Sequence, residues 1–323
     1  MQYLVTGGAG FIGSHLAERL LGEGHHVTIL DDLSTGRFEN IAGVVDHDQM
    51  RFIKDSVLRS DLVDGLVREC HRVFHLASAV GVRLIMERPV ETIESIVQGT
   101  AVVLQACARY HKRVLLTSTS EVYGKSANVP FREDGDRLEG PTTKHRWAYA
   151  AAKALDEFLA LAHWKESRLP TVVVRLFNTV GPRQSGRYGM VLPNFVAAAL
   201  RGDDLLVHGD GRQSRCFCHV GDVIVALDRL MECPTARGQV VNVGSDHEIN
   251  ILDLARRVVD RAGSASRIRL VPYELAYGEG FEDMNRRVPS IEKVEALTGW
   301  RPETSLDRII DDMIADQRQH GLP

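Results

Sequence analysis

Tyr149 and Lys153 are the two side chains of this sequence with the clearest chemical potential. They stand four residues apart in the segment YAAAK, so a helix places the phenol and the ammonium on one face. A phenol has an ordinary pKa of about 10 and is a poor base at neutral pH. Because a nearby ammonium stabilises the phenolate, we expect Lys153 to lower the pKa of Tyr149. The pair predicts a base that removes a proton from a substrate hydroxyl.

A run of hydroxyl and carboxyl side chains follows the apolar segment RVLL, which is typical of a buried strand. The run is TSTSEVYG and contains Thr119, Ser120 and Glu121. Ligands bind at the carboxyl ends of the strands in open α/β sheets, so these side chains should face the crevice. A hydroxyl there can polarise the substrate oxygen that Tyr149 deprotonates. We therefore take Thr119, Ser120 and Glu121 as candidate catalytic residues.

Three glycines near the start of the chain predict a dinucleotide site. Gly7, Gly10 and Gly13 give the pattern G-x-x-G-x-x-G between the strand-like QYLVT and the helical FIGSHLAERLL. Glycine lets the backbone turn tightly and approach a pyrophosphate, which the free N–H groups of the helix N-terminus then bind. We expect the three glycines, with Phe11 and Ile12 between them, to contact the cofactor.

Two carboxylates decide which dinucleotide this site should take. The second strand-like segment ends in Asp31 and Asp32, and Asp31 lies 18 residues after Gly13. A carboxylate there accepts hydrogen bonds from the adenosine ribose hydroxyls and repels a 2′-phosphate. The sequence therefore favours NAD over NADP. For Asp32 the alternative role of a turn residue stays open.

Short β-branched runs alternate with longer helical patterns in the first half of the chain. The strand-like segments are QYLVTG, HVTILDD, MRFIKD, RVFHLAS, RVLLTSTS and TVVVRLFN. The helical patterns lie near residues 12–23, 59–69, 91–111 and 147–167. This alternation predicts an α/β fold with a Rossmann-type, doubly wound parallel sheet.

The second half is less regular and predicts a smaller, interleaved C-terminal domain for the substrate. A helix is expected near 190–201 and a turn at 209–211, while QVVNVG reads as a late strand of the first sheet. We expect residues 1–177 and about 213–247 to form the NAD-binding domain. Residues of about 178–212 and 248–323 should form the substrate domain.

The composition is that of an ordinary globular protein. Of the 323 residues 44% are hydrophobic and 25% charged, and the formal net charge is −4. This charge gives no footprint for nucleic acid or for an acidic membrane surface. No segment approaches the roughly 18 consecutive apolar residues of a membrane span. The N-terminus has no signal-peptide pattern, and we expect a cytoplasmic protein.

The five cysteines are scattered through apolar segments, which is typical of reduced thiols. Cys216 and Cys218 stand two residues apart, but no second pair of cysteine or histidine residues follows at ligand spacing. Buried packing is therefore favoured over metal binding for both, and no metal is expected.

These motifs occur in an order that resembles the extended short-chain dehydrogenases that act on nucleotide sugars. The order is the glycine motif, Asp31, HLAS at 75–78, STSEVYG at 118–124, YAAAK and RLFNTVGPR at 175–183. The resemblance covers essentially the whole chain. It implies oxidation of the sugar at C4, with Lys153 also holding the nicotinamide ribose. It further implies that Leu76 and Asp55 contact the cofactor and that Ser78 contacts the substrate, although Asp55 is equally suited to cap a helix.

Members of this family share C4 oxidation and differ in the next step: epimerases return the hydride to the other face, dehydratases eliminate across C5–C6, and decarboxylases lose a C5 carboxylate. The last two need groups that manage an enolate, which gives Glu121 a role near C5. The segments KHRWAY at 144–149, YGEGFED at 277–283 and RQSRCF at 212–217 resemble UDP-glucuronate decarboxylases, including the decarboxylase domain of the bifunctional lipid-A aminoarabinose enzyme. The residues expected to bind a UDP-linked sugar are Ser78, Arg146, Asn178, Arg215, Tyr277 and Arg287.

Arg287 is expected to act on the sugar carboxylate or as an acid, because a guanidinium binds a carboxylate in bidentate geometry. The sequence thus favours a UDP-glucuronate decarboxylase that forms UDP-xylose. A UDP-sugar 4-epimerase stays open because GPRQSGRYGMVLPNF at 181–195 is partly epimerase-like. A dehydratase and a non-catalytic NAD-binding regulator are further alternatives. The apolar stripes at 91–111 and 147–167 suggest a homodimer, since the family pairs these helices across a dimer.

Overall fold

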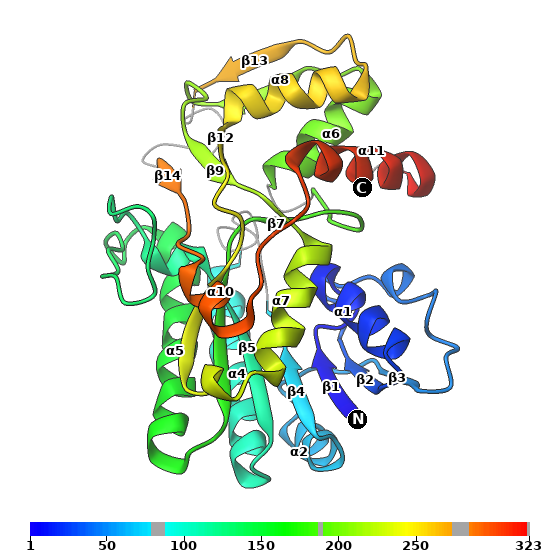
Figure 1. Ribbon diagram of the computed structural model, residues 1–323, viewed down its shortest axis with the longest axis vertical. Coiled ribbons are helices and arrows are strands. Elements are labelled where there is room, and N and C mark those ends of the chain that lie inside the picture. Colours follow the sequence, from blue (N-terminus) through cyan, green and yellow to red (C-terminus); the bar gives the residue numbers. More distant parts are fainter. Residues whose placement is uncertain (79–87, 187–189, 273–283, 322–323) are drawn as a thin grey trace.

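The computed structural model describes residues 1–78, 88–186, 190–272 and 284–321. A seven-stranded parallel sheet forms its centre, and a smaller lobe lies beyond the carboxyl ends of the strands (Figure 1). The predicted fold class is confirmed. The residue boundaries of the two domains stay a prediction.

The central sheet has the strand order β11-β6-β5-β4-β1-β2-β3. Every neighbouring pair in it is parallel. The chain moves outward from β1 in one direction and then returns to β4 on the other side, so the order reverses between β1 and β4. Such a reversal leaves a crevice at the carboxyl ends of these strands, where open α/β sheets bind ligands. The strands are β1 (Gln2–Thr6), β2 (His26–Leu30), β3 (Met50–Ile53), β4 (Arg72–His75), β5 (Arg113–Thr119), β6 (Thr171–Leu176) and β11 (Gln239–Val243).

Helices cover both faces of this sheet. One face packs against α1 (Phe11–Gly22), α7 (Val220–Glu232) and α10 (Glu292–Thr298), the other against α2 (Ser60–Glu69), α4 (Pro89–Arg109) and α5 (Ala148–Ser167). Successive strand residues point to opposite faces. Tyr3 and Val5 therefore join the core under α1 and α7, whereas Leu4 joins the core under α2 and α4. Burial on both faces explains why the strands read as continuous apolar runs.

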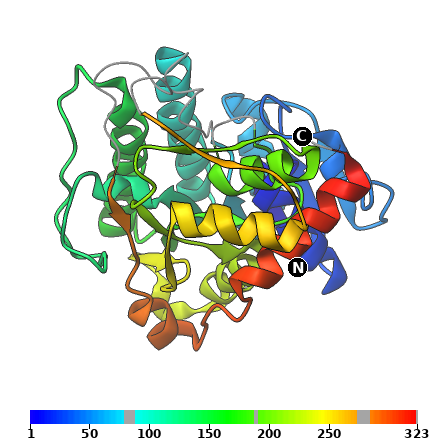
Figure 2. The same cartoon turned by 90° about the horizontal axis from the view of Figure 1, so that it is seen from above.

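The smaller lobe has its own apolar core. Figure 2 views the molecule from above, with the helices of this lobe in front of the sheet. The larger elements of the lobe are α6 (Val191–Arg201), β8 (Leu205–His208), α8 (Ile251–Ala262), β13 (Ile268–Val271) and α11 (Leu306–His320). Short strands connect the lobe to the sheet: β7 (Thr179–Val180), β9 (Ser214–Cys216), β10 (Cys218–His219), β12 (Glu248–Asn250) and β14 (Arg286–Arg287). β9 lies between β12 and β14, so it brings residues 214–216 beside 286–287.

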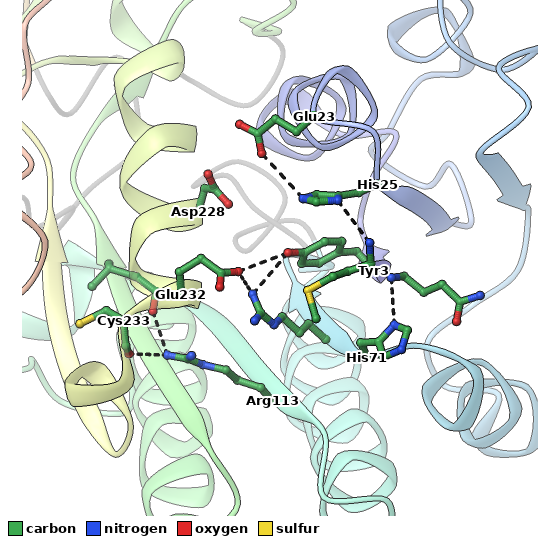
Figure 3. A network of polar contacts seen from close by, with 12 residues as sticks. Tyr3, Glu23, His25, His71, Arg113, Asp228, Glu232 and Cys233 are labelled. Carbon is green, nitrogen blue, oxygen red and sulfur yellow. Dashed lines mark hydrogen bonds and ion pairs between the residues drawn. The ribbon is translucent and has the colours of Figure 1, made fainter.

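Polar contacts fasten α7 to the amino-terminal edge of the sheet (Figure 3). Arg72 of β4 pairs with Glu232 in the last turn of α7. Arg113 of β5 donates to the carbonyl oxygens of Leu230, at 3.2 Å, and of Cys233. Basic side chains commonly satisfy the free carbonyl groups at helix C-termini. These contacts hold α7 in place at the edge opposite the crevice.

A buried ion pair joins α5 to β6. Glu157 and Arg175 are only 4% and 5% exposed. Arg175 donates from Nη2 to Glu157 Oε2 at 2.8 Å and from Nε to Oε1 at 3.0 Å. Its guanidinium also lies over the Tyr123 ring, 4.7 Å from the centroid. Removing one partner would leave the other charge buried without compensation.

We expect Glu157→Gln to lower the free energy of unfolding by about 3–5 kcal/mol, the usual cost of breaking a buried pair. Urea denaturation measures this loss. Glu166→Gln on the exposed face of the same helix is the matched control and should change stability by less than about 0.5 kcal/mol. Equal stability of the two variants would contradict a structural role for the pair.

Candidate active site

A cleft of about 1360 Å³ opens at the carboxyl ends of the central strands, between the sheet and the smaller lobe. Except for Tyr277, which lies outside the described residues, every site residue predicted from the sequence lines it. They are Gly7, Gly10, Phe11, Ile12, Gly13, Asp31, Asp32, Asp55, Leu76, Ser78, Thr119, Ser120, Glu121, Arg146, Tyr149, Lys153, Asn178, Arg215 and Arg287. The structure thus brings together residues from the whole length of the chain.

The glycine turn leaves no room for side chains. Gly7 has a φ of +72°, and a Cβ there would lie 2.6 Å from the backbone nitrogen of Ala77. A Cβ on Gly13 would lie 2.2 Å from the Gly7 carbonyl oxygen. The first turn of α1 is therefore packed directly against the end of β1, with its N-terminus at the cleft. This arrangement fits the pyrophosphate of NAD, which helix N-terminal N–H groups bind.

The three predicted carboxylates of the cofactor end differ in burial. Asp31 is buried, and its two oxygens accept from the backbone N–H groups of Ala9 and Leu33, both at 2.9 Å. Burial raises the pKa of Asp31, and these two N–H groups oppose the rise. Asp32 is exposed and accepts from the N–H of Ser34 at 2.9 Å, as a turn residue does.

Asp55 also has local partners. Its Oδ1 accepts from the N–H of Ser56 at 2.8 Å, and its Oδ2 lies 3.2 Å from Arg59 Nη1. It does not cap α2, because that helix begins at Ser60 with Arg59 as the preceding residue. Contact with the adenine remains a prediction for Asp55.

A buried carboxylate held by two arginines lies deep in the cleft. Glu121 stands on the 3₁₀ helix Ser120–Tyr123, directly after β5, and is 8% exposed. Its Oε1 lies 2.8 Å from Arg287 Nη2 of β14. Its Oε2 contacts Arg146, which comes from the 3₁₀ helix His145–Trp147. Three segments remote in sequence thus converge on one carboxylate.

The charges around Glu121 keep it ionised. Burial raises the pKa of Glu121, but the guanidinium groups of Arg287 and Arg146, and that of Arg215 beyond them, outweigh burial and lower it to about 2. Among the described residues, Arg287 Nε is also buried without a hydrogen-bond acceptor. This donor of Arg287 supports binding of a further anionic ligand.

The environment of Tyr149 differs from the sequence expectation. Tyr149 is 7% exposed, and burial is the main cause that raises the pKa of its phenol. The charge of Glu121 raises this pKa further, whereas the hydroxyls of Thr119 and Ser78 lower it. The pKa is thus raised and not lowered, contrary to the prediction from the Tyr149–Lys153 spacing. The ammonium of Lys153 instead donates to Asp156 Oδ2 at 3.0 Å.

Asp156 is the partner of a site residue, Lys153, and the sequence reasoning missed it. It lies on α5 three residues after Lys153, and both side chains are buried. Residues three apart are neighbours on a helix surface, so the spacing of Lys153 and Asp156 in the sequence could have predicted their contact. The motif Y-x-x-x-K ends at Lys153 and does not include the partner that a buried ammonium requires.

Arg215 and Asn178 lie where the smaller lobe meets the sheet. Arg215 of β9 is 7% exposed and donates to the Ser214 carbonyl oxygen at 2.8 Å. Asn178 follows β6 and donates from Nδ2 to the Cys216 carbonyl oxygen at 2.8 Å. Both side chains line the cleft beyond Glu121. Their predicted contact with a diphosphate remains a prediction.

Cys216 and Cys218 pack in the interior. They are 0% and 1% exposed, and burial raises the pKa of the Cys216 thiol to about 12. Within the described residues, no group of three or more His, Cys, Asp or Glu side chains is arranged to hold a metal ion. Across the same ranges, no helix has the length and apolar character to cross a membrane.

The low pKa of Glu121 predicts acid sensitivity. A carboxylate whose pKa falls from 4.5 to about 2 on folding stabilises the fold at a pH above 4.5. This contribution is lost as the pH decreases from 4.5 towards 2. Unfolding free energies measured across this range should fall more steeply for the wild type than for Glu121→Gln, which cannot titrate. Parallel curves would contradict the charge assignment.

Comparisons with known proteins agree with the geometry of this cleft. The family model described as GDP-mannose 4,6 dehydratase matches residues 4–313. The chain is 42% identical over 315 residues to a UDP-N-acetyl-alpha-D-glucosaminuronate decarboxylase of Bacillus cytotoxicus, with 96% of each chain covered. It is 34% identical over 313 residues to UDP-glucuronic acid decarboxylase 1 of Xenopus tropicalis, covering 97% of this chain and 71% of the relative.

Solved structures show the same architecture. A UDP-glucuronic acid 4-epimerase variant from Bacillus cereus, in complex with UDP-4-deoxy-4-fluoro-glucuronic acid and NAD, has a TM-score of 0.89 and 26% identity, with 99% of both chains covered. The match of the family model over nearly the whole chain agrees with the resemblance seen in the motifs. This chain belongs to the GDP-mannose 4,6 dehydratase family of NAD-dependent nucleotide-sugar epimerases, dehydratases and decarboxylases.

Proposed function

We propose that this protein is an NAD-dependent decarboxylase of a UDP-linked hexuronate. The observation that carries the proposal is the convergence of Arg146 and Arg287 on the Glu121 carboxylate, within the cleft that Tyr149 lines. Among the described residues, two buried guanidinium groups face this one carboxylate and Arg287 Nε has no acceptor, which supports binding of a sugar carboxylate beside them. A neutral hexose would supply no such charge.

Tyr149 and its neighbours carry the first step. The phenolate of Tyr149 removes the proton of the C4 hydroxyl, and the Thr119 hydroxyl polarises the C4 oxygen. When bound, NAD would accept a hydride from C4 and would return it after decarboxylation. The glycine turn and Asp31 support NAD binding, and Lys153 supports the ribose nearest the reacting carbon. The product of this step is a 4-keto sugar whose C5 carboxylate is β to the ketone.

Decarboxylation follows from that arrangement. The C5–carboxylate bond breaks, CO₂ leaves, and the electron pair forms an enolate between C5 and C4. Arg287 orients the carboxylate before the bond breaks. A proton must then reach C5, and Glu121 is placed at this end of the cleft to order the water or the arginine that delivers it. Arg215 and Asn178 support binding of the substrate diphosphate.

The relatives favour two sugar acids. The Xenopus tropicalis relative is named for UDP-glucuronic acid, which is the substrate favoured by the sequence motifs. The Bacillus cytotoxicus relative, which is more similar at 42% identity, is named for UDP-N-acetyl-glucosaminuronate. The two acids share the C4 hydroxyl and the C5 carboxylate and differ at C2. The proposed chemistry is the same for both.

A 4-epimerase is the second candidate. The observation in its favour is the structural match to the Bacillus cereus UDP-glucuronic acid 4-epimerase, over 99% of both chains. An epimerase would use the same oxidation by Tyr149 and would hold the carboxylate without losing it. A non-catalytic regulator would have no need of Tyr149, Lys153 and Thr119, which this chain retains.

The assembly and the compartment are also proposed. Exposed apolar side chains lie on the two helices that pack together beside the sheet: Val90 and Ile93 on α4, and Leu155 and Phe158 on α5. Pairing of these helices with a second copy would bury them, which supports a homodimer. The five cysteines are free, which fits the reducing cytoplasm.

Incubation with NAD and each of four UDP-sugars tests the activity: UDP-glucuronate, UDP-N-acetyl-glucosaminuronate, UDP-glucose and UDP-N-acetylglucosamine. We expect CO₂ release and a UDP-pentose, or its 2-acetamido analogue, from at least one of the two acids, by chromatography and mass spectrometry. Tyr149→Phe should lower the rate by roughly 10²–10⁴-fold, the usual contribution of a positioned base. Formation of a 4-epimer without CO₂ would overturn decarboxylation in favour of the second candidate.

We also expect Glu121→Gln to separate C4 oxidation from the later steps of the reaction. Rapid mixing with the sugar acid should show NADH absorbance forming at a near-normal rate but persisting, because protonation at C5 and hydride return are slowed. Arg286→Gln, which removes an exposed arginine adjacent to Arg287, is the matched control and should decay like the wild type. Equal slowing of both phases in Glu121→Gln would count against its role at C5.

A further inference from the structure

A chain of buried polar groups extends from Lys153 away from the cleft. Lys153 Nζ and Asp156 Oδ2 are 3.0 Å apart, and their side chains are 3% and 0% exposed. The hydroxyl of Thr100, on α4, acts on Asp156 and lowers the pKa of that carboxyl. His75 Nε2 lies 3.2 Å from the same hydroxyl, and its Nδ1 lies 2.7 Å from Thr6 Oγ1. These five residues come from β1, β4, α4 and α5.

Asp156 is the negative charge that faces Lys153 in this chain. Burial, and secondarily the charge of Lys153, lower the pKa of His75 to about 3, so the imidazole is neutral. Thr6 and Thr100 carry no charge. Glu157 follows Asp156 on α5, but it is bound to Arg175 in a bidentate ion pair. Among these buried polar groups, Asp156 is therefore the one whose negative charge offsets the positive charge of Lys153.

Two carboxylates raise the pKa of Tyr149, and they differ in how they are balanced. Glu121 is held by two arginines, Arg146 and Arg287. Asp156 is held by Lys153, the same ammonium that would otherwise stabilise the Tyr149 phenolate. Burial raises the pKa of Asp156, while Lys153 and the Thr100 hydroxyl favour its ionised form. Its charge therefore depends on partners that lie outside the Y-x-x-x-K motif.

We propose that Asp156 is a positioning residue that holds the Lys153 ammonium on α5, offsets its charge and so sets the pH at which Tyr149 accepts the substrate proton. The catalytic consequence rests on the proposed function. The charge balance between Lys153 and Asp156 does not rest on the proposed function, because both groups belong to the protein itself and are present without substrate. A purely structural contact would only fix the position of Lys153. The proposed role also changes the pH dependence of Tyr149 and the relative affinities for NAD⁺ and NADH.

Asp156→Asn is the central test, because it keeps the shape and one acceptor oxygen and removes only the charge. With Lys153 no longer offset, the phenolate of Tyr149 is favoured. The acid limb of the pH–rate profile should then move to lower pH by roughly one unit, the smaller end of the effect of a nearby charge. Glu166→Gln, exposed on the same helix, is the matched control and should leave the profile unchanged.

A second readout needs no sugar substrate. The nicotinamide ring is cationic in NAD⁺ and neutral in NADH, so an uncompensated Lys153 should disfavour NAD⁺. Calorimetric titrations should show the ratio of the two affinities shifting against NAD⁺ by roughly threefold or more in Asp156→Asn. Thr100→Val removes the hydroxyl that stabilises the Asp156 carboxylate, and should shift both readouts the same way by less. The Thr100→Val variant provides the test if the Asp156→Asn variant does not fold.

The outcomes separate this proposal from the proposed function. A shifted affinity ratio without turnover of any sugar acid would support Asp156 and overturn the decarboxylase. Turnover with an unchanged acid limb and an unchanged ratio, in whichever of Asp156→Asn and Thr100→Val folds, would overturn the role of Asp156. A shift of the acid limb to higher pH would overturn it as well.

Discussion

The cleft is organised by one buried carboxylate, that of Glu121, which among the described residues contacts two buried guanidinium groups. A charge in the protein interior is costly unless it is paired. Glu121 satisfies this requirement through Arg146 and Arg287, which come from a 3₁₀ helix before α5 and from a short strand of the smaller lobe. The pairing therefore also joins the smaller lobe to the sheet, together with contacts such as that of Arg183 with Glu18 of α1.

The parallel sheet makes this convergence possible. Its strands end at one edge, so the residues that follow β1, β4, β5 and β6 meet there whatever their separation in sequence. β9 then places Arg215 beside Arg287 by pairing with β14. At the opposite end of the strands, Arg72 contacts Glu232 of α7 and Arg113 contacts carbonyl groups at the end of that helix, and neither arginine lines the cleft. The catalytic candidates thus lie at the carboxyl ends of the strands, while the contacts at their amino ends hold α7 against the sheet.

The sequence predicted most of this where a motif is local. The geometry of such a motif is set by a few neighbouring residues. Examples are the glycine turn, the strand-like segment that ends at Asp31 and the pair Tyr149–Lys153. The convergence of Arg146 and Arg287 on Glu121 is a contact between distant segments, and the sequence suggested only that each touches the sugar. The pKa of Tyr149 was predicted in the wrong direction. Spacing showed a nearby ammonium, but it showed neither the burial of the phenol nor the acid that binds the ammonium.

That error is informative about how the site must operate. A base that is buried beside carboxylates holds its proton firmly, so the resting site keeps Tyr149 as a phenol. In the proposed reaction, NAD⁺ would add the positive charge of its nicotinamide to the cleft when bound, and a positive charge near the phenol favours the phenolate. In the proposed reaction a sugar carboxylate has the opposite sign, and binding to Arg146 and Arg287 would balance its charge. These arginines would then let an anionic substrate enter without raising the pKa of Tyr149 further.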